Sequence, residues 1–303
     1  MILFILIASV FFFVPSAHAN FSMTITPAFQ ELEVTPEEDK IVTFIEVTNE
    51  TDITLMLDLF AVDFVQADDL GNVALVNQVG SDYRLADYIA IPESDISVNP
   101  GETAKIQVDI LNKADLTLGG HYGAVVARTR SQDVGNYQQV LPAVSSLLLV
   151  HKTGGERYNL SLTDFTVTGG NWQLRQPKTT SLTVSNEGNI HLVPKGLITF
   201  TDLFDRIVYK GVINESSSFV LPQSRRQYTS KLQRLRWAWP VMVYNVEVSG
   251  SSNADTPFFA QEQVVVVSPT VIGGLLVVVI GGWWLGRRGW RKRNSDQELA
   301  ESE

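Results

Sequence analysis

The chain has 303 residues, a formal net charge of −10 at pH 7 and no cysteine. An acidic surface disfavours nucleic acid and other anionic polymers as partners. The absence of cysteine excludes disulfide bonds, so each folded domain has to rest on its hydrophobic core alone. The length leaves room for two domains of ordinary size in addition to shorter terminal segments.

The first residues predict a signal peptide over 1–19. An uncharged apolar run extends from Met1 to Val14, and Ala17-His18-Ala19 then supplies the small residues that a signal peptidase requires. No Lys or Arg precedes the run, so the usual positive segment is absent. A permanent N-terminal anchor is the alternative, but the run is short for a membrane span. We expect export, with a mature chain that begins near Asn20.

Residues 20–154 are predicted to form an immunoglobulin-like β-sandwich. Short runs rich in β-branched and aromatic residues, such as 41–49 and 54–65, alternate with turn signals such as Asn99-Pro-Gly101. In 103–110 apolar and polar residues alternate strictly, as expected of a strand with one buried face. About seven such strands indicate two packed antiparallel sheets.

Residues 155–265 repeat this pattern and predict a second immunoglobulin-like sandwich, so the fold class is all-β with one C-terminal helix. Tyr122 and Tyr244, late in the two domains, resemble the buried strand tyrosines of such sandwiches. A polar motif in the second domain is predicted to be a structural corner, because Asn tolerates positive φ and Gly permits a tight turn. His191 is then a satisfied corner residue rather than a ligand. The motif comprises Asn186, Gly188, Asn189 and His191.

The C-terminal region predicts a transmembrane helix over 266–286 and a cytoplasmic tail over 287–303. Residues 264–285 carry no charge, and five basic residues follow directly. Trp pairs suit the membrane interface, and basic flanks resist translocation. We therefore expect a single-pass protein of the cell membrane, with its N-terminus outside. The predicted anchor residues are Trp283, Trp284, Arg287 and Arg288.

A candidate binding platform lies just before the last strands of the second domain. Trp237 and Trp239 share a face if this stretch is extended, and Arg234 and Arg236 lie beside them. If the rings are exposed, they offer a platform for sugar rings or a partner protein. Burial in the core of the sandwich is the interpretation that we favour. The basic residues fit either anionic headgroups and polymers or charges that protect a strand edge.

The sequence contains no catalytic or metal-binding motif. The three histidines of the mature chain are far apart, and no nucleophile elbow or phosphate-binding loop is present. Asp63, Asp68 and Asp69 lack the alternating pattern of a calcium loop, which favours a solvated acidic turn. We expect a protein that is not an enzyme and that binds no cofactor or metal.

Several stretches together resemble the WxL-interacting protein family of Gram-positive surfaces. Residues 186–191, 194–202 and 219–226 are similar to its membrane-proximal domain, while 98–108 and 119–126 look like the peptidoglycan-binding domain that precedes it. The resemblance covers nearly the whole chain. It implies a first domain that contacts the cell wall, a second that engages host or matrix protein, and WxL proteins docked alongside. The glycine that such domains carry before the Tyr244 position is absent, so no binding residue is carried over.

Three functions are compatible with these features. The leading one is a membrane-anchored bacterial cell-surface binding or scaffold protein, whose partner is cell-wall polymer or a surface protein. The alternative is an assembly chaperone for surface proteins that holds a client strand at an open sheet edge, and a long unpaired edge in the first domain would favour it. An accessory subunit of a membrane complex is the third.

Overall fold

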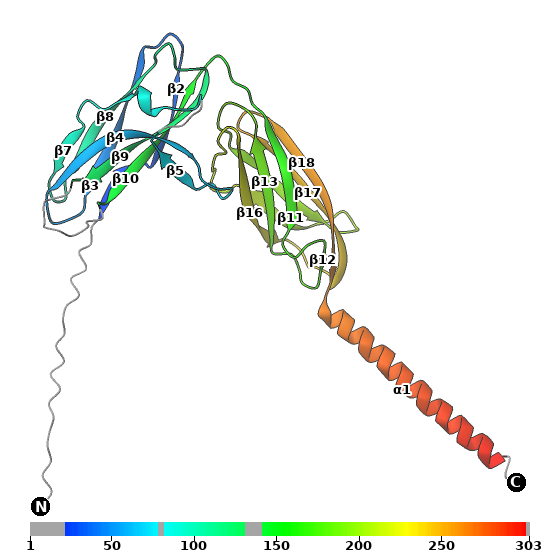
Figure 1. Cartoon of the computed structure of the whole chain (residues 1–303). Helices are drawn as coiled ribbons and strands as arrows, with labels where there is room; N and C mark the ends of the chain where they lie inside the picture. The colour runs from blue at the N-terminus through cyan, green and yellow to red at the C-terminus, as the bar shows by residue number, and fades with distance from the viewer. Residues whose placement is uncertain (1–21, 78–81, 131–140, 301–303) are drawn as a thin grey trace, which may run out of the picture.

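The computed structural model describes residues 22–77, 82–130 and 141–300, in two β-sandwiches and one helix (Figure 1). The signal peptide predicted over 1–19 lies outside the described residues. The two sandwiches meet at an angle, and the helix extends away from the second of them. The connection between them covers 153–159 and contains the boundary predicted after residue 154. The first sandwich is called domain 1 and the second domain 2.

Domain 1 consists of a four-stranded sheet packed on a six-stranded one. The smaller sheet has the order β1 (Met23–Thr26), β3 (Lys40–Asn49), β8 (Thr103–Leu111), β6 (Ile89–Ala90). The larger has the order β2 (Phe29–Val34), β10 (Ala143–Lys152), β9 (Gly119–Thr129), β4 (Leu55–Gln66), β5 (Val73–Val76), and β7 (Asp95–Val98) also pairs with β4. The short 3₁₀ helix η1 (Ala86–Tyr88) precedes β6.

The alternation in the sequence explains the core of domain 1. In β8 the side chains of Ile106, Val108 and Ile110 are buried, while Lys105 and Gln107 are exposed, as predicted. They pack against Leu57 and Leu59 of the opposite sheet in one apolar cluster. Burial of each such side chain stabilises the fold by roughly 1.5–3 kcal/mol, which suffices for a sandwich without disulfides.

Domain 2 is one eight-stranded sheet that folds around a single core. Its strand order is β11 (Leu160–Val167), β13 (Thr179–Asn186), β16 (Ser224–Arg234), β15 (Ile207–Ile213), β14 (Pro194–Thr201), β17 (Val241–Ser252), β18 (Pro257–Val267), β12 (Trp172–Gln173). Phe200, Tyr209 and Tyr244 stack edge to face with ring centroids 5.7–6.2 Å apart. Tyr244 is fully buried, as predicted.

The C-terminal helix α1 (Pro269–Ala300) corrects the prediction of a single-pass membrane location. Within the described residues, no helix combines the length and the apolar character needed to cross a membrane. The uncharged part of α1 ends at Gly286, about 25 Å from Pro269, whereas a bilayer core measures about 30 Å. Five glycines and two tryptophans further lower the apolar character of this stretch. Trp283 and Trp284 are exposed on α1, and Arg287 lies over the Trp283 ring.

Candidate functional site

The six-stranded sheet of domain 1 is apolar on both faces, and domain 2 covers part of its outer face. Side chains from β4, β9 and β10 that point away from the domain 1 core form a separate cluster with Leu221 of domain 2. Phe219 of domain 2 packs on the same cluster. The interface between the domains is therefore built on apolar burial. We call this group the interface cluster; its buried members are Val62, Phe64, Tyr122, Ala124, Val126, Leu149 and Leu221.

Hydrogen bonds from two separate parts of domain 1 flank the interface cluster. The β4–β5 hairpin reaches β16 (Figure 1), where the backbone N–H of Gln227 donates to the carbonyl of Asp69 at 2.6 Å. At the start of β9, the backbone N–H of Gly120 donates to the carbonyl of Asn189 at 2.8 Å. Backbone bonds of this kind fix the direction in which domain 2 meets domain 1.

The predicted corner motif forms the domain 2 side of this interface. Asn186 is fully buried; its Nδ2 donates to the carbonyls of Ile190 and Val220 at 2.8 and 3.0 Å, and its Oδ1 accepts from the N–H of Gly188. A side chain at Gly188 would collide with the carbonyl of Arg157, only 2.2 Å from the Cβ position. Asn189 binds the backbone of the interdomain connection through both ends of its amide. The motif thus forms a corner, and that corner holds domain 2 against domain 1.

His191 is buried at the domain interface and contacts Tyr122 of β9. Its backbone N–H donates to the Tyr122 hydroxyl at 2.7 Å, and its Nδ1 lies 3.3 Å from the same hydroxyl. Burial lowers the pKa of the imidazole to about 4, with a smaller contribution from His151, so the ring is neutral at pH 7. Burial also raises the pKa of the Tyr122 hydroxyl. Tyr122 is buried as predicted, but in the interface cluster and not in the core of domain 1.

We expect Tyr122→Phe to lower the free energy of unfolding by about 1–3 kcal/mol, because two buried groups of His191 lose their partner. Urea denaturation measures the change. Tyr158→Phe is the control, since the Tyr158 side chain is substantially exposed, and its effect should stay within about 0.5 kcal/mol. Equal urea concentrations at the unfolding midpoints of the two variants would show that the Tyr122 hydroxyl contributes nothing to stability.

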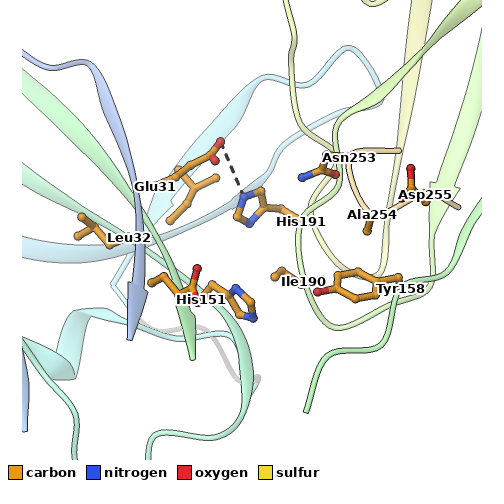
Figure 2. Close-up of a pocket in the computed structure, with 11 residues that line it drawn as sticks. Glu31, Leu32, His151, Tyr158, Ile190, His191, Asn253, Ala254 and Asp255 are labelled. Carbon is orange, nitrogen blue, oxygen red and sulfur yellow. Dashed lines mark ion pairs between the residues drawn. The ribbon is translucent and has the colours of Figure 1, made fainter. Parts of the chain in front are cut away.

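A cavity of about 570 Å³ opens between the domains next to His191 (Figure 2). Domain 1 contributes the outer faces of β2 and β10, and domain 2 contributes the corner and the turn between β17 and β18. Figure 2 shows the His191 ring directed at Glu31 of β2, with Nε2 3.9 Å from the carboxylate. The lining residues that carry polar side chains are Glu31, Glu33, His151, Tyr158, His191, Asn253 and Asp255.

The second feature is an edge at the start of β10 that lacks a paired strand, although β1 of the other sheet approaches β10. β2 pairs with β10 in parallel, but the pairing begins only where Phe29 meets Leu147. Residues 143–146 of β10 pair with β9 on one side. On the other side, no strand pairs with them within the described part of the chain. We call this stretch the β10 edge.

The other predicted site residues lie apart from both features. Trp237 and Trp239 follow β16 at the end of domain 2 away from the interface, and they are 75% and 49% exposed, so the favoured prediction of burial is wrong. Arg234 and Arg236 beside them are exposed as well.

The acidic residues Asp63 and Asp68 have backbone partners. Asp63 is buried and accepts from two backbone N–H groups, while Asp68 accepts from the turn that follows it. Among the described residues, no group of three or more His or acidic side chains is placed to hold a metal ion.

The cavity and the β10 edge were not predicted from the sequence. Both depend on how distant segments meet, and β2 and β10 are more than 100 residues apart. A weak signal was available for β10, since 140–150 is nearly continuous in apolar residues and thus typical of a strand with two covered faces.

No protein-family model and no curated protein matches the chain. Among solved structures, the E. coli chaperone DraB is 9% identical, with a TM-score of 0.36 over 81% of this chain and 95% of its own. The class 5 fimbriae chaperone CfaA is 10% identical, with a TM-score of 0.39 over 80% and 99%. The Salmonella enterica SafA pilin–SafB chaperone complex contains a chain that is 8% identical, with a TM-score of 0.39 over 79% and 96%.

The names of these three structures mention chaperones, and none of them mentions a WxL-interacting protein. At such identities and TM-scores the likeness does not decide what this chain does. Its function has to follow from its own geometry.

Proposed function

We propose that the chain is an assembly chaperone for surface proteins, which holds an extended segment of its client at the β10 edge. The observation that supports the proposal most directly is the unpaired backbone of this edge beside an apolar sheet face. An exposed strand edge is a template for another strand, and proteins that do not use such edges cover or charge them.

The hydrogen bonds around β10 show which backbone groups are available. The N–H of Leu147 donates to the carbonyl of Ala28 on the β2 side, and the carbonyl of Pro142 accepts from Thr129 on the β9 side. Because backbone groups alternate in direction along a strand, odd-numbered residues of β10 face the β2 side. The N–H and C=O groups of Ala143 and Ser145 therefore point to the open side, in line with β2.

Apolar side chains next to the edge would receive those of the client. Phe29, the first residue of β2, is 52% exposed and packs edge to face against Phe219 of domain 2, with ring centroids 6.4 Å apart. Leu147 and Phe60 lie on the same face and are partly exposed. A client strand at the edge would extend this face by one more row of side chains.

The binding free energy of a client would come from backbone hydrogen bonds and from apolar contacts. Two residues offer at most four backbone hydrogen bonds, each worth about 0.5–1.5 kcal/mol net. Micromolar affinity requires about 8 kcal/mol, so the apolar contacts of the client have to supply the remaining ~2–6 kcal/mol. A chaperone of this kind would select segments in which apolar residues alternate with polar ones. Because its affinity is modest, it could still release them.

The wall-binding interpretation has less in its favour. Sugar rings are commonly bound by stacking on exposed aromatic rings, of which tryptophan offers the largest face. All six tryptophans of the chain follow residue 171, so domain 1, the expected wall-binding domain, contains none. A protein partner fits the edge of domain 1 better than a polymer does.

We expect Ser145→Pro to reduce strand binding at least tenfold, because proline removes the outward N–H and its ring occupies the space of a partner strand. The fold should be retained, since this N–H takes no part in the pairing with β9. The probe is a fluorescent ten-residue peptide of alternating valine and threonine, and its affinity is measured by anisotropy. Ser145→Ala, which keeps the N–H, should bind like the unmodified protein.

Two results would contradict the proposal. One is equal affinity of the proline and alanine variants for the peptide. The other is unchanged binding of a peptide that is N-methylated at alternate residues and so cannot pair with an edge. In cells, a photo-reactive residue at position 143 should cross-link exported surface subunits, and Ser145→Pro should abolish these products.

A further inference from the structure

The cavity between the domains is lined by negatively charged side chains, and its described lining includes no basic side chain other than histidine. Glu31, Glu33 and Asp255 line it, and no Lys or Arg is among the lining residues. The three carboxylates form no hydrogen bond with any described residue, and Glu31 lies 3.9 Å from Nε2 of His191. His151, the other imidazole in the lining, is engaged with Glu156 at 2.8 Å.

His191 adds a largely buried side chain whose Nε2 is aimed into this cavity. Its side chain is only 7% exposed, and Nδ1 is next to the Tyr122 hydroxyl. Nε2 points at Glu31 across the cavity (Figure 2), and no described residue forms a hydrogen bond with it. When the ring proton is on Nδ1 and is donated to Tyr122, Nε2 is a free acceptor. Nε2 therefore offers the cavity an acceptor that a donor group of a ligand can use.

We infer that the cavity receives a positively charged group of the client, a lysine or arginine side chain or an amino terminus. Such a group donates several hydrogen bonds, and the lining offers acceptors at Nε2 of His191 and at the carboxylates of Glu31 and Glu33. A client carboxylate would meet like charge and is rejected. A bare metal ion fits less well, because no described group of ligands converges as a metal site requires.

This inference rests on the proposed function and adds a rule for client choice. The cavity touches β10 at Leu149, four residues beyond Ser145 at the open edge. Four residues of strand cover about 13 Å. A client held at the edge would therefore bring a basic residue to the cavity when it stands about four to five positions beyond the paired segment.

The first experiment tests the cavity without any strand. N-acetyl-lysine-N-methylamide is titrated into the full protein, and the ring proton signals of His191 and His151 are followed by NMR, with His191→Gln for assignment. We expect saturable shifts with the lysine compound and none with the corresponding glutamine and glutamate compounds. The double variant Glu31→Gln/Glu33→Gln should lose the shifts, whereas Glu37→Gln/Glu215→Gln, with the same loss of charge at exposed sites, should keep them.

The second experiment places the charge on a strand. Three alternating peptides carry lysine, glutamine or glutamate five positions beyond the paired segment, and their affinities are compared by anisotropy. We expect the lysine peptide to bind about tenfold tighter than the glutamine peptide, and the glutamate peptide to bind weakest. The preference should disappear in Glu31→Gln/Glu33→Gln, and Ser145→Pro should weaken all three peptides alike.

The outcomes separate the two proposals. Equal affinities of the three peptides, or shifts caused equally by the glutamate compound, would overturn the charged-group inference and leave strand binding intact. Shifts with the lysine compound but no binding of any peptide would overturn strand binding and leave the cavity as a site for cations. Retention of the lysine preference in the double variant would show that the cavity is not its source.

Discussion

Replacing Asn186 with alanine is expected to lower the free energy of unfolding by about 3–5 kcal/mol, a large share of the stability of a domain of this size. The amide of Asn186 satisfies two carbonyls and one N–H at a fully buried position, so its removal leaves three backbone groups unpaired. Because the same corner carries His191 and Asn189, the contact with domain 1 should weaken as well. Urea denaturation followed by tryptophan fluorescence measures the loss, since Trp172, Trp237 and Trp239 all belong to domain 2.

Asn159→Ala is the matched control for this variant. Asn159 is exposed, and its side chain forms one hydrogen bond, with Glu187. Its replacement should change stability by no more than about 0.5 kcal/mol. If Asn186→Ala unfolds at the same urea concentration as the control, the amide of Asn186 is not the element that fixes the corner.

Acidification is expected to lower the free energy of unfolding by up to about 3 kcal/mol between pH 7 and pH 4 through His191 alone. The pKa of the folded imidazole is about 4, because burial disfavours its charged form, against 6.5 for the exposed side chain. Between these values the unfolded chain binds a proton that the folded chain does not bind, so stability rises with pH. The contribution is complete above about pH 6.5 and is lost as the pH falls towards 4.

Urea denaturation at a series of pH values tests this expectation. His191→Gln should flatten the pH dependence, because glutamine keeps polar contacts near Tyr122 but does not titrate. His121, whose pKa burial also lowers, should contribute in the same direction, so His121→Gln is expected to remove a separate share. The groups that face His191 are Tyr122, Glu31 and His151. An unchanged pH profile for His191→Gln would mean that its ring becomes charged without cost in the folded protein.

The fold class followed from local patterns in the sequence. Strict alternation in 103–110 and turn signals such as Asn99-Pro-Gly101 are sufficient to indicate strands and their boundaries. The corner motif was also predictable, because Asn and Gly in that spacing satisfy the backbone of a tight turn. Asn49 at the end of β3 binds the carbonyls of Ile53 and Val98 in the way that Asn186 binds those of Ile190 and Val220, so both domains use the same device.

The site could not be predicted in the same way. The cavity brings together Glu31, His151 and Asp255, whose separations in the chain have no pattern. The β10 edge results from the register of β2, which no local signal specifies. Trp237 and Trp239 were expected inside because tryptophan contributes much apolar area, but the connection that carries them protrudes beyond the sheet. The helix was expected to span a membrane because an uncharged run of about 25 Å is followed by basic residues, but no described helix is long and apolar enough to do so.

The interface cluster has a practical consequence for work on separate halves of the molecule. Cutting the chain between residues 153 and 159 would uncover Phe64, Tyr122 and Val126 on one piece and Leu221 on the other. Apolar faces of this kind adhere to many surfaces, so a truncated first half would be expected to self-associate and to stick to resins and filters. Retention of such a fragment on any matrix would then reflect the apolar surface exposed by truncation. Affinity is therefore better measured on the intact protein with both domains.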